Sequence, residues 1–196
     1  MMRTLKILLF LFISCLCFGC QSSLRRESRI EKQDDVYVLS FANLSFSVSA
    51  GKGGRIVSFK CEDRELLTSD SVHSKYYGAT FWLSPQSEYW PQYQCVDELP
   101  YQAEIDKQIL RLVSPPDSIS GVSVTKEFSI SERDSSILIH YSVRNVSRQL
   151  KRLAPWDVTR VYGGLSFFPV GETDQMNKSD VTGGYEDKGM VWVPCP

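Results

Sequence analysis

The stretch VSVTKEFSISERDSSILIHYSVRN, residues 122–145, alternates between apolar and polar side chains on both sides of a polar turn. The turn is residues 131–135, and the apolar positions around it are Val122, Val124, Phe128, Ile130, Ile137, Ile139, Tyr141 and Val143. Alternate residues of an extended chain share one face. The stretch therefore predicts a long antiparallel hairpin with one apolar face and one polar face.

Shorter segments with strand character flank this hairpin on both sides. They are residues 36–41, 44–48, 55–60, 79–83, 108–113, 152–161 and 165–168, with turn residues such as Gly51, Gly53 and Gly54 or Gly163 and Gly164 between neighbours. No segment beyond the N-terminal apolar run has a convincing helical period. The pattern predicts an all-β chain folded as an antiparallel β-sandwich.

The N-terminus is typical of a secretory signal. Arg3 and Lys6 precede an apolar run of about a dozen residues that ends at Gly19-Cys20, too short for a comfortable membrane span. A cysteine directly after the small residue resembles a bacterial lipoprotein signal, with lipidation of Cys20; the alternative is an ordinary signal peptide. We expect a signal peptide over residues 1–19, a flexible tether over 20–35 and one domain over 36–196. A lipid-anchored protein of the cell envelope would meet glycans, peptides and wall fragments.

Composition excludes several classes of function. The formal net charge is -1 and no basic face is evident, so we expect no nucleic-acid partner. No phosphate-cradling glycine loop or nucleophile elbow is present, and we expect no cofactor. The cysteines left beyond Cys20 are Cys61, Cys95 and Cys195, which lack metal-site spacing and allow either one disulfide with a free thiol or three small buried apolar residues.

Aromatic residues gather in the segment 69–101, which includes Trp82 and Trp90 among several tyrosines and prolines. Outside a possible strand at 79–83, this segment is expected to be a long loop. Long loops in a compact domain are usually functional or disordered, and the aromatic content argues against disorder.

A second aromatic candidate lies in LAPWDVTRV, residues 153–161. In an extended chain Trp156 and Arg160 point to one face and Asp157 to the other. An indole offers a flat apolar surface to a sugar ring, and a guanidinium donates to hydroxyls. The alternative is a core tryptophan with an arginine at the sheet edge.

The remaining candidates are isolated titratable residues. Glu172 follows Gly171 just after a strand and is suited to accept sugar hydroxyls, while Glu88 has the same standing in the aromatic segment. His73 enters that segment and is a possible acid or base by its intrinsic pKa. His140 falls on the polar face of the hairpin and is expected at the surface.

Four stretches together resemble a known family: GGRIVSF (53–59), FWLSPQ (81–86), the hairpin from VTKEFSI (124–130) to YSVRN (141–145), and LAPWDVTR (153–160). The chain resembles a domain of unknown function common in Bacteroides-type lipoproteins and related to the galactose mutarotase (aldose 1-epimerase) superfamily. The resemblance implies a galactose mutarotase-like β-supersandwich with a carbohydrate ligand in a groove on one sheet.

Members with epimerase activity use a general acid and a general base, usually a histidine and a late glutamate. The stretch SRQLK, residues 147–151, lacks that histidine. Compared with a full supersandwich, we expect the domain ending at Pro196 to be C-terminally truncated, without the later strands and the late glutamate. No catalytic residue is therefore assigned. We expect a membrane-tethered carbohydrate-binding protein with Trp82, Trp90, Trp156, Arg160 and Glu172 at its site and no metal. The alternatives are an aldose 1-epimerase-like enzyme using His73 or Glu172 and a structural envelope protein.

Overall fold

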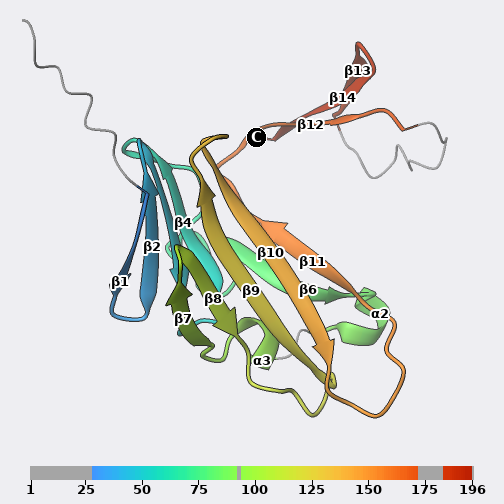
Figure 1. The fold of residues 1–196 in the computed structure, drawn as a ribbon. Helices are drawn as coiled ribbons and strands as arrows, with labels where there is room; N and C mark the ends of the chain where they lie inside the picture. The colour runs from blue at the N-terminus through green and yellow to red at the C-terminus, as the bar shows by residue number, and fades with distance from the viewer. Residues whose placement is uncertain (1–27, 92–93, 172–182, 196) are drawn as a thin grey trace, which may run out of the picture.

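The computed structural model describes residues 28–91, 94–171 and 183–195 (Figure 1). The described residues are mostly β, with 55% in strands and 5% in helices, and the sheets are antiparallel. The predicted all-β, sandwich-like class is confirmed.

The largest sheet has the strand order β1-β2-β3-β4-β6-β11, with β5 paired to β4. Its strands are β1 (Arg29–Gln33), β2 (Val36–Phe41), β3 (Leu44–Ser49), β4 (Arg55–Cys61), β5 (Arg64–Glu65), β6 (Ala79–Ser84) and β11 (Ala154–Thr159). The first four pair through successive hairpins. Strand β11 returns from far along the chain to pair with β6, which sets Trp156 opposite Trp82.

The second sheet has the order β10-β9-β8-β7. It comprises β7 (Gln102–Asp106), β8 (Ile109–Val113), β9 (Val122–Ser131) and β10 (Ser136–Asn145). The β9–β10 register runs from Ser131 opposite Ser136 to Val122 opposite Asn145, which confirms the predicted hairpin.

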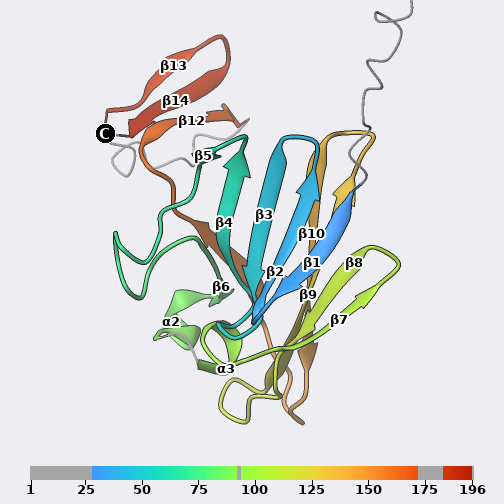
Figure 2. The same cartoon turned by 90° about the vertical axis from the view of Figure 1, so that its left-hand side faces the viewer.

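The hydrophobic core fills the space between these two sheets, which face each other in Figure 2. Phe46 of β3 contacts Phe128 of β9 with 5.8 Å between ring centroids, and Phe81 of β6 contacts Tyr141 of β10 at 4.8 Å. Burying a side chain of this size stabilises the fold by about 1.5–3 kcal/mol. The alternating apolar residues of the predicted hairpin therefore form part of the core.

Two single-turn helices interrupt the aromatic segment, α2 (Gln86–Tyr89) and α3 (Gln94–Asp97). Both lie near the same end of the sandwich, beside β6 (Figure 2). The sequence predicted loop here, because a helix of one turn is too short to show a period.

A third sheet has the order β12-β14-β13 and stands apart from the other two at the opposite end (Figures 1 and 2). Its strands are β12 (Gly164–Pro169), β13 (Tyr185–Asp187) and β14 (Met190–Cys195). Only β12 was expected from the sequence. Cys195 ends β14, while Cys61 is half-buried, Cys95 is buried and both are free thiols.

The structure corrects the predicted tether over residues 20–35. Arg29–Gln33 forms strand β1, in which Ile30 lies opposite Leu39 of β2 and packs against the core. The strand was not predicted because most of its side chains are charged or polar, although charges are common on edge strands. The predicted signal peptide, Cys20 and the start of the tether lie outside the described residues.

Candidate functional site

Strand β6 is buried on both of its faces, and the candidate site lies on the face that points away from the core. Phe81 and Leu83 point into the sandwich core, so Thr80 and Trp82 point to the opposite face. All four are buried, and the aromatic segment covers Trp82 on that opposite face. The candidate site therefore lies on the outer face of the largest sheet, under the loops around α2 and α3.

An aromatic cluster surrounds Trp82 and consists of Tyr76, Trp82, Trp90 and Trp156. Ring centroids of Trp82 lie 6.0 Å from Tyr76, 5.3 Å from Trp90 and 5.4 Å from Trp156, all in edge-to-face geometry. Trp82 is 6% exposed, whereas Trp90 is 46% exposed. The cluster thus has a fixed centre and one ring that presents apolar surface to solvent.

Arg160 lies against this cluster. Its guanidinium is 5.4 Å from the Trp82 ring centroid and 5.6 Å from that of Tyr76. Its Nη1 donates to Thr80 Oγ1 at 3.0 Å and to the Val158 carbonyl at 3.2 Å. These contacts hold the guanidinium within cation–π distance of both rings, an arrangement that cation–π attraction stabilises.

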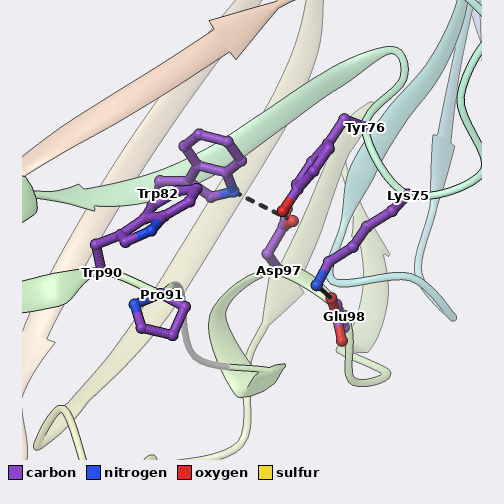
Figure 3. A pocket seen from close by; sticks show the side chains of 7 residues that line it. All are labelled: Lys75, Tyr76, Trp82, Trp90, Pro91, Asp97 and Glu98. Atoms are coloured by element: carbon purple, nitrogen blue, oxygen red, sulfur yellow. Dashed lines mark hydrogen bonds and ion pairs between the residues drawn. The ribbon is translucent and has the colours of Figure 1, made fainter.

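Asp97, the last residue of α3, supplies the acidic group of the site. Its Oδ2 accepts from Arg55 Nη2 at 3.0 Å. The same oxygen accepts from Trp82 Nε1 at 3.3 Å (Figure 3). The side chain is only 6% exposed, yet Oδ1 has no hydrogen-bond partner among the described residues. Burial raises the pKa of Asp97, although the charge of Arg55 opposes that effect.

A small cavity of about 30 Å³ opens at this carboxylate. Its walls are Lys75, Tyr76, Trp82, Trp90, Pro91, Asp97 and Glu98 (Figure 3). A cavity of this size holds a water-sized group such as a hydroxyl, and a whole sugar ring would have to lie outside it.

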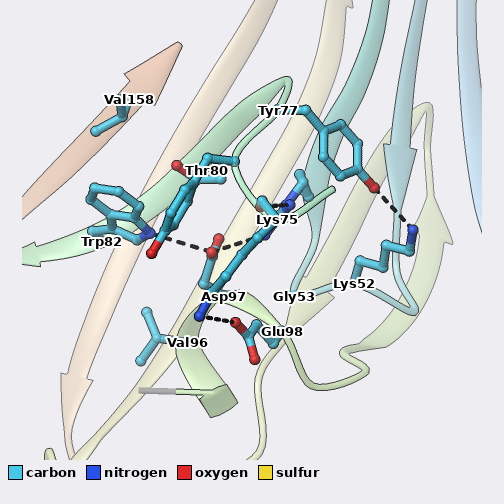
Figure 4. A network of polar contacts seen from close by, with 12 residues as sticks. Lys52, Gly53, Lys75, Tyr77, Thr80, Trp82, Val96, Asp97, Glu98 and Val158 are labelled. Carbon is cyan, nitrogen blue, oxygen red and sulfur yellow. Dashed lines mark hydrogen bonds and ion pairs between the residues drawn. The ribbon is translucent and has the colours of Figure 1, made fainter. Parts of the chain in front are cut away.

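A larger cavity of about 230 Å³ adjoins the first. It is lined by Lys52, Arg55, Ser74, Lys75, Tyr77 and Glu98, so Lys75 and Glu98 belong to both. These two side chains form an ion pair of 3.3 Å at the shared wall (Figure 4).

The turn at Gly53 and Gly54 holds Asp97 in place. Gly53 has φ +63° and donates its N–H to the Leu99 carbonyl at 3.1 Å. A Cβ at Gly53 would collide with the backbone carbonyl of Asp97, so only glycine lets the two backbones approach this closely.

Lys126 supports the same turn from the core. It projects from β9 between Val124 and Phe128, is fully buried, and its Nζ donates to the Gly53 carbonyl at 2.7 Å. The ammonium also lies 5.1 Å from the Phe81 ring centroid. Burial lowers the pKa of Lys126 to about 7, although the attraction of Asp97 acts to raise it.

The structure brings Trp82, Trp90, Trp156 and Arg160 together around one point, although they were predicted from two separate stretches. Glu172 lies outside the described residues. Trp156 of β11 and Arg160, which directly follows β11, both lie against the Trp82 ring, on one side of the chain as predicted, and both are half-buried.

The isolated candidates are placed differently. His73 is exposed; its ring stacks on Tyr76 at 5.0 Å, and its Nδ1 accepts from the Tyr76 N–H at 2.9 Å, which closes the loop turn. Glu88 is exposed on α2 and lines neither cavity described above. His140 is exposed on β10, as predicted.

Sequence reasoning missed Asp97, Arg55 and Lys126. Lys126 had a signal, because it interrupts a run of inward apolar positions in the hairpin. Arg55 follows the two glycines of the turn, and nothing in the sequence indicates that its side chain is buried. Asp97 had no pattern at all, because its role comes from a one-turn helix.

Comparison with known proteins adds no relative: no family model matches the chain, and no curated protein matches it. Within residues 28–91, 94–171 and 183–195, no group of three or more histidine, cysteine, aspartate or glutamate side chains gathers in a way that could hold a metal ion. In the same residues no helix is both long and apolar enough to cross a membrane.

Proposed function

We propose that this protein binds carbohydrate at the aromatic cluster, with a sugar ring against Trp90 and one hydroxyl donating to Asp97 Oδ1. The observation that supports this most strongly is the buried carboxylate oxygen of Asp97, which no described residue satisfies. An unpaired buried acceptor costs about 1–3 kcal/mol, and a ligand hydroxyl in the small cavity would remove that cost.

The surroundings of Asp97 favour a sugar over an apolar ligand. A sugar ring carries CH faces that pack on indole and hydroxyls that need fixed polar partners. Trp90 offers the apolar surface, Asp97 the acceptor, and Lys75 and Glu98 line the same cavity. An apolar ligand would leave Asp97 Oδ1 unpaired.

Exchange of Trp90 tests the binding proposal. Trp90→Ala should lower the affinity for the glycans that the protein binds by about 10-fold, the equivalent of about 1.4 kcal/mol of lost stacking. The matched control is Tyr185→Ala on β13, which removes an aromatic ring of similar exposure on the third sheet. Isothermal titration against a glycan panel measures both. Unchanged affinity in Trp90→Ala, or a folded protein that binds no glycan, would overturn the proposal.

A sugar-active enzyme of the aldose 1-epimerase type is the second candidate, and one observation favours it. A carboxyl whose pKa is raised by burial in a cavity is suited to general acid or base catalysis, and Asp97 is such a group. Polarimetry of fresh α-glucose and α-galactose tests this candidate. Acceleration that Asp97→Asn abolishes in a folded protein would establish it, and no acceleration by the unaltered chain would exclude it for these sugars.

The membrane anchor is a proposal from the sequence. Lipidation of Cys20 would hold the binding domain at a bacterial membrane, with carbohydrate as its other partner. Cys20→Ala should move the protein from the membrane fraction to the soluble fraction after cell disruption. A variant that stays with the membrane would contradict lipid anchoring at this residue. A common origin with the galactose mutarotase superfamily likewise remains a proposal that rests on the four resembling stretches.

A further inference from the structure

We propose that the larger cavity beside the aromatic cluster binds the anionic group of an acidic sugar, so that the ligand is a glycan with uronate or sulfated units. This inference rests on the proposed carbohydrate binding and names the class of glycan. Its basis is the set of cationic groups around a space of about 230 Å³.

The charge of the cavity is the first argument. Lys52, Arg55 and Lys75 line it against one acidic residue, Glu98. Asp97 pairs with Arg55 at 3.0 Å, and Glu98 pairs with Lys75 at 3.3 Å. Lys52 is therefore the cation of this cavity that has no acidic partner within ion-pair distance among the described residues.

Lys52 is held at the wall of the cavity by Tyr77, which lines the same cavity. Its Nζ donates to the Tyr77 hydroxyl at 3.0 Å and lies 5.5 Å from the centroid of the same ring (Figure 4). The hydrogen bond to Tyr77 raises the pKa of Lys52, so the group is an ammonium at neutral pH. An ammonium has three N–H donors, and Tyr77 uses one of them.

Arg55 adds a donor that lacks an acceptor. Its Nη1 donates to the Lys75 carbonyl at 2.7 Å and its Nη2 to Asp97 at 3.0 Å, which fixes the plane of the guanidinium. The side chain is 5% exposed, and its Nε is buried without a hydrogen-bond partner in the described part of the chain. A buried donor without an acceptor costs free energy, and an acceptor oxygen that reached it from the cavity would remove that cost.

The Lys75–Glu98 pair allows an anion to enter. The two side chains are 59% and 36% exposed, and an exposed pair of this kind contributes about 0–1 kcal/mol. Lys75 can therefore exchange Glu98 for the anionic group of a ligand at little cost. Because both residues also line the smaller cavity, a sugar ring on the aromatic cluster would have a substituent within reach of the larger one.

The test uses matched oligosaccharides of gluco, galacto and manno configuration. Each is prepared as the 6-carboxylate and its methyl ester, and as the 6-sulfate and the unsulfated sugar, so that each pair differs in charge. Titration of the full chain should show one charged form binding at least 10-fold tighter than its neutral partner. The carboxylate pairs and the sulfate pairs then distinguish uronate from sulfate.

Exchange of Lys52 tests where the anion binds. In Lys52→Gln the preference for the charged form over the neutral form should fall at least fivefold, while affinity for the neutral form stays unchanged. The matched control is Lys60→Gln, an exposed lysine on β4 that lines neither cavity.

The outcomes separate this inference from the proposed function. Equal affinity for charged and neutral partners would overturn the anionic subsite and leave carbohydrate binding standing. A preference for charge that persists in Lys52→Gln would also overturn it, because the anion would then bind elsewhere. Failure of every oligosaccharide to bind a folded protein would overturn both proposals.

Discussion

The Nζ atom of Lys126 lies 2.7 Å from the carbonyl oxygen of Gly53, whose backbone in turn lies directly against Asp97. Lys126, buried between the two sheets, is thus linked through one glycine to the backbone of the residue whose carboxylate belongs to the candidate site. The charges of the buried Asp97 and the exposed Asp157 both act to raise the pKa of Lys126, and Asp157 accepts a hydrogen bond from Tyr141 at 2.9 Å. Changes at Lys126 or Gly53 should therefore affect both the free energy of unfolding and the position of Asp97 in the candidate site.

Lys126 predicts how stability depends on pH. Its pKa of about 7 in the folded protein lies below the ordinary value of 10.5, so above pH 7 the unfolded chain holds a proton that the folded protein has released. The free energy of unfolding should therefore rise with pH between about 6.5 and 8.5, with a slope of up to about 1.4 kcal/mol per pH unit. Urea denaturation at several pH values measures this. The measurements stay below pH 9. Above pH 9, Cys95, whose pKa burial raises to about 12, would make the free energy of unfolding fall with pH.

Lys126→Met supplies the control for that pH dependence. It keeps much of the length of the side chain and removes the titrating group, so the rise in this window should disappear whatever the variant's absolute stability. A slope that persists in Lys126→Met would show that another group carries it.

Gly53→Ala should be strongly destabilising. The positive φ of Gly53 alone costs a residue with a Cβ about 1–2 kcal/mol, and the collision with the Asp97 backbone adds to that. Gly189→Ala is the matched control, because Gly189 has φ +74° but open space where its Cβ would be. Thermal denaturation should rank Gly53→Ala well below Gly189→Ala; equal losses would mean that the close approach to Asp97 has no energetic weight.

Arg55→Met should destabilise the fold by about 3–5 kcal/mol, because it leaves the Asp97 carboxylate buried without its cation. The comparison is Arg111→Met. Arg111 is about half exposed and its ion pairs with Glu104 and Glu127 are both 3.7 Å long, so its loss should cost less than about 1 kcal/mol. Chemical denaturation of both variants checks the difference, and similar losses would contradict the importance of the buried pair.

Glu65 should stabilise the protein at neutral pH and lose that effect in acid. Burial alone would raise the pKa of Glu65, but hydrogen bonds from Ser58 Oγ and from the N–H groups of Phe59, Leu67 and Leu66 outweigh it and lower the pKa. The contribution is therefore complete above the ordinary value of 4.5 and is lost as pH falls below it.

Glu65→Gln tests the role of Glu65 at two pH values. The substitution should lower the free energy of unfolding by about 1–3 kcal/mol at pH 7. It should lower it by less at pH 3, which lies below the ordinary value of 4.5, where the charge-dependent contribution is being lost. The same loss at both pH values would mean that the charge of Glu65 has no part in its effect.

The β-strands could be predicted because alternation of apolar and polar residues is a local signal. It identified β2, β3, β4, β8, β9 and β10 closely, and it failed for β1, whose charged residues leave Ile30 as the visible apolar position. The convergence of Trp82 and Trp156 depends on the pairing of β6 with β11, which no local pattern encodes. Asp97 lay beyond prediction for a similar reason: its burial comes from the packing of a one-turn helix against residues distant in the chain.

Strand β6 lies between the hydrophobic core and the candidate site, and this limits how the ligand preference of the protein can change. Phe81 and Leu83 anchor the strand in the core, so its backbone cannot shift to suit a new ligand at Thr80 or Trp82 without disturbing the packing of both sheets. Trp90 and Lys52, by contrast, are exposed and lie outside the strands. Diversification of specificity among descendants of this sequence should therefore accumulate at such loop positions, while β6 stays nearly invariant.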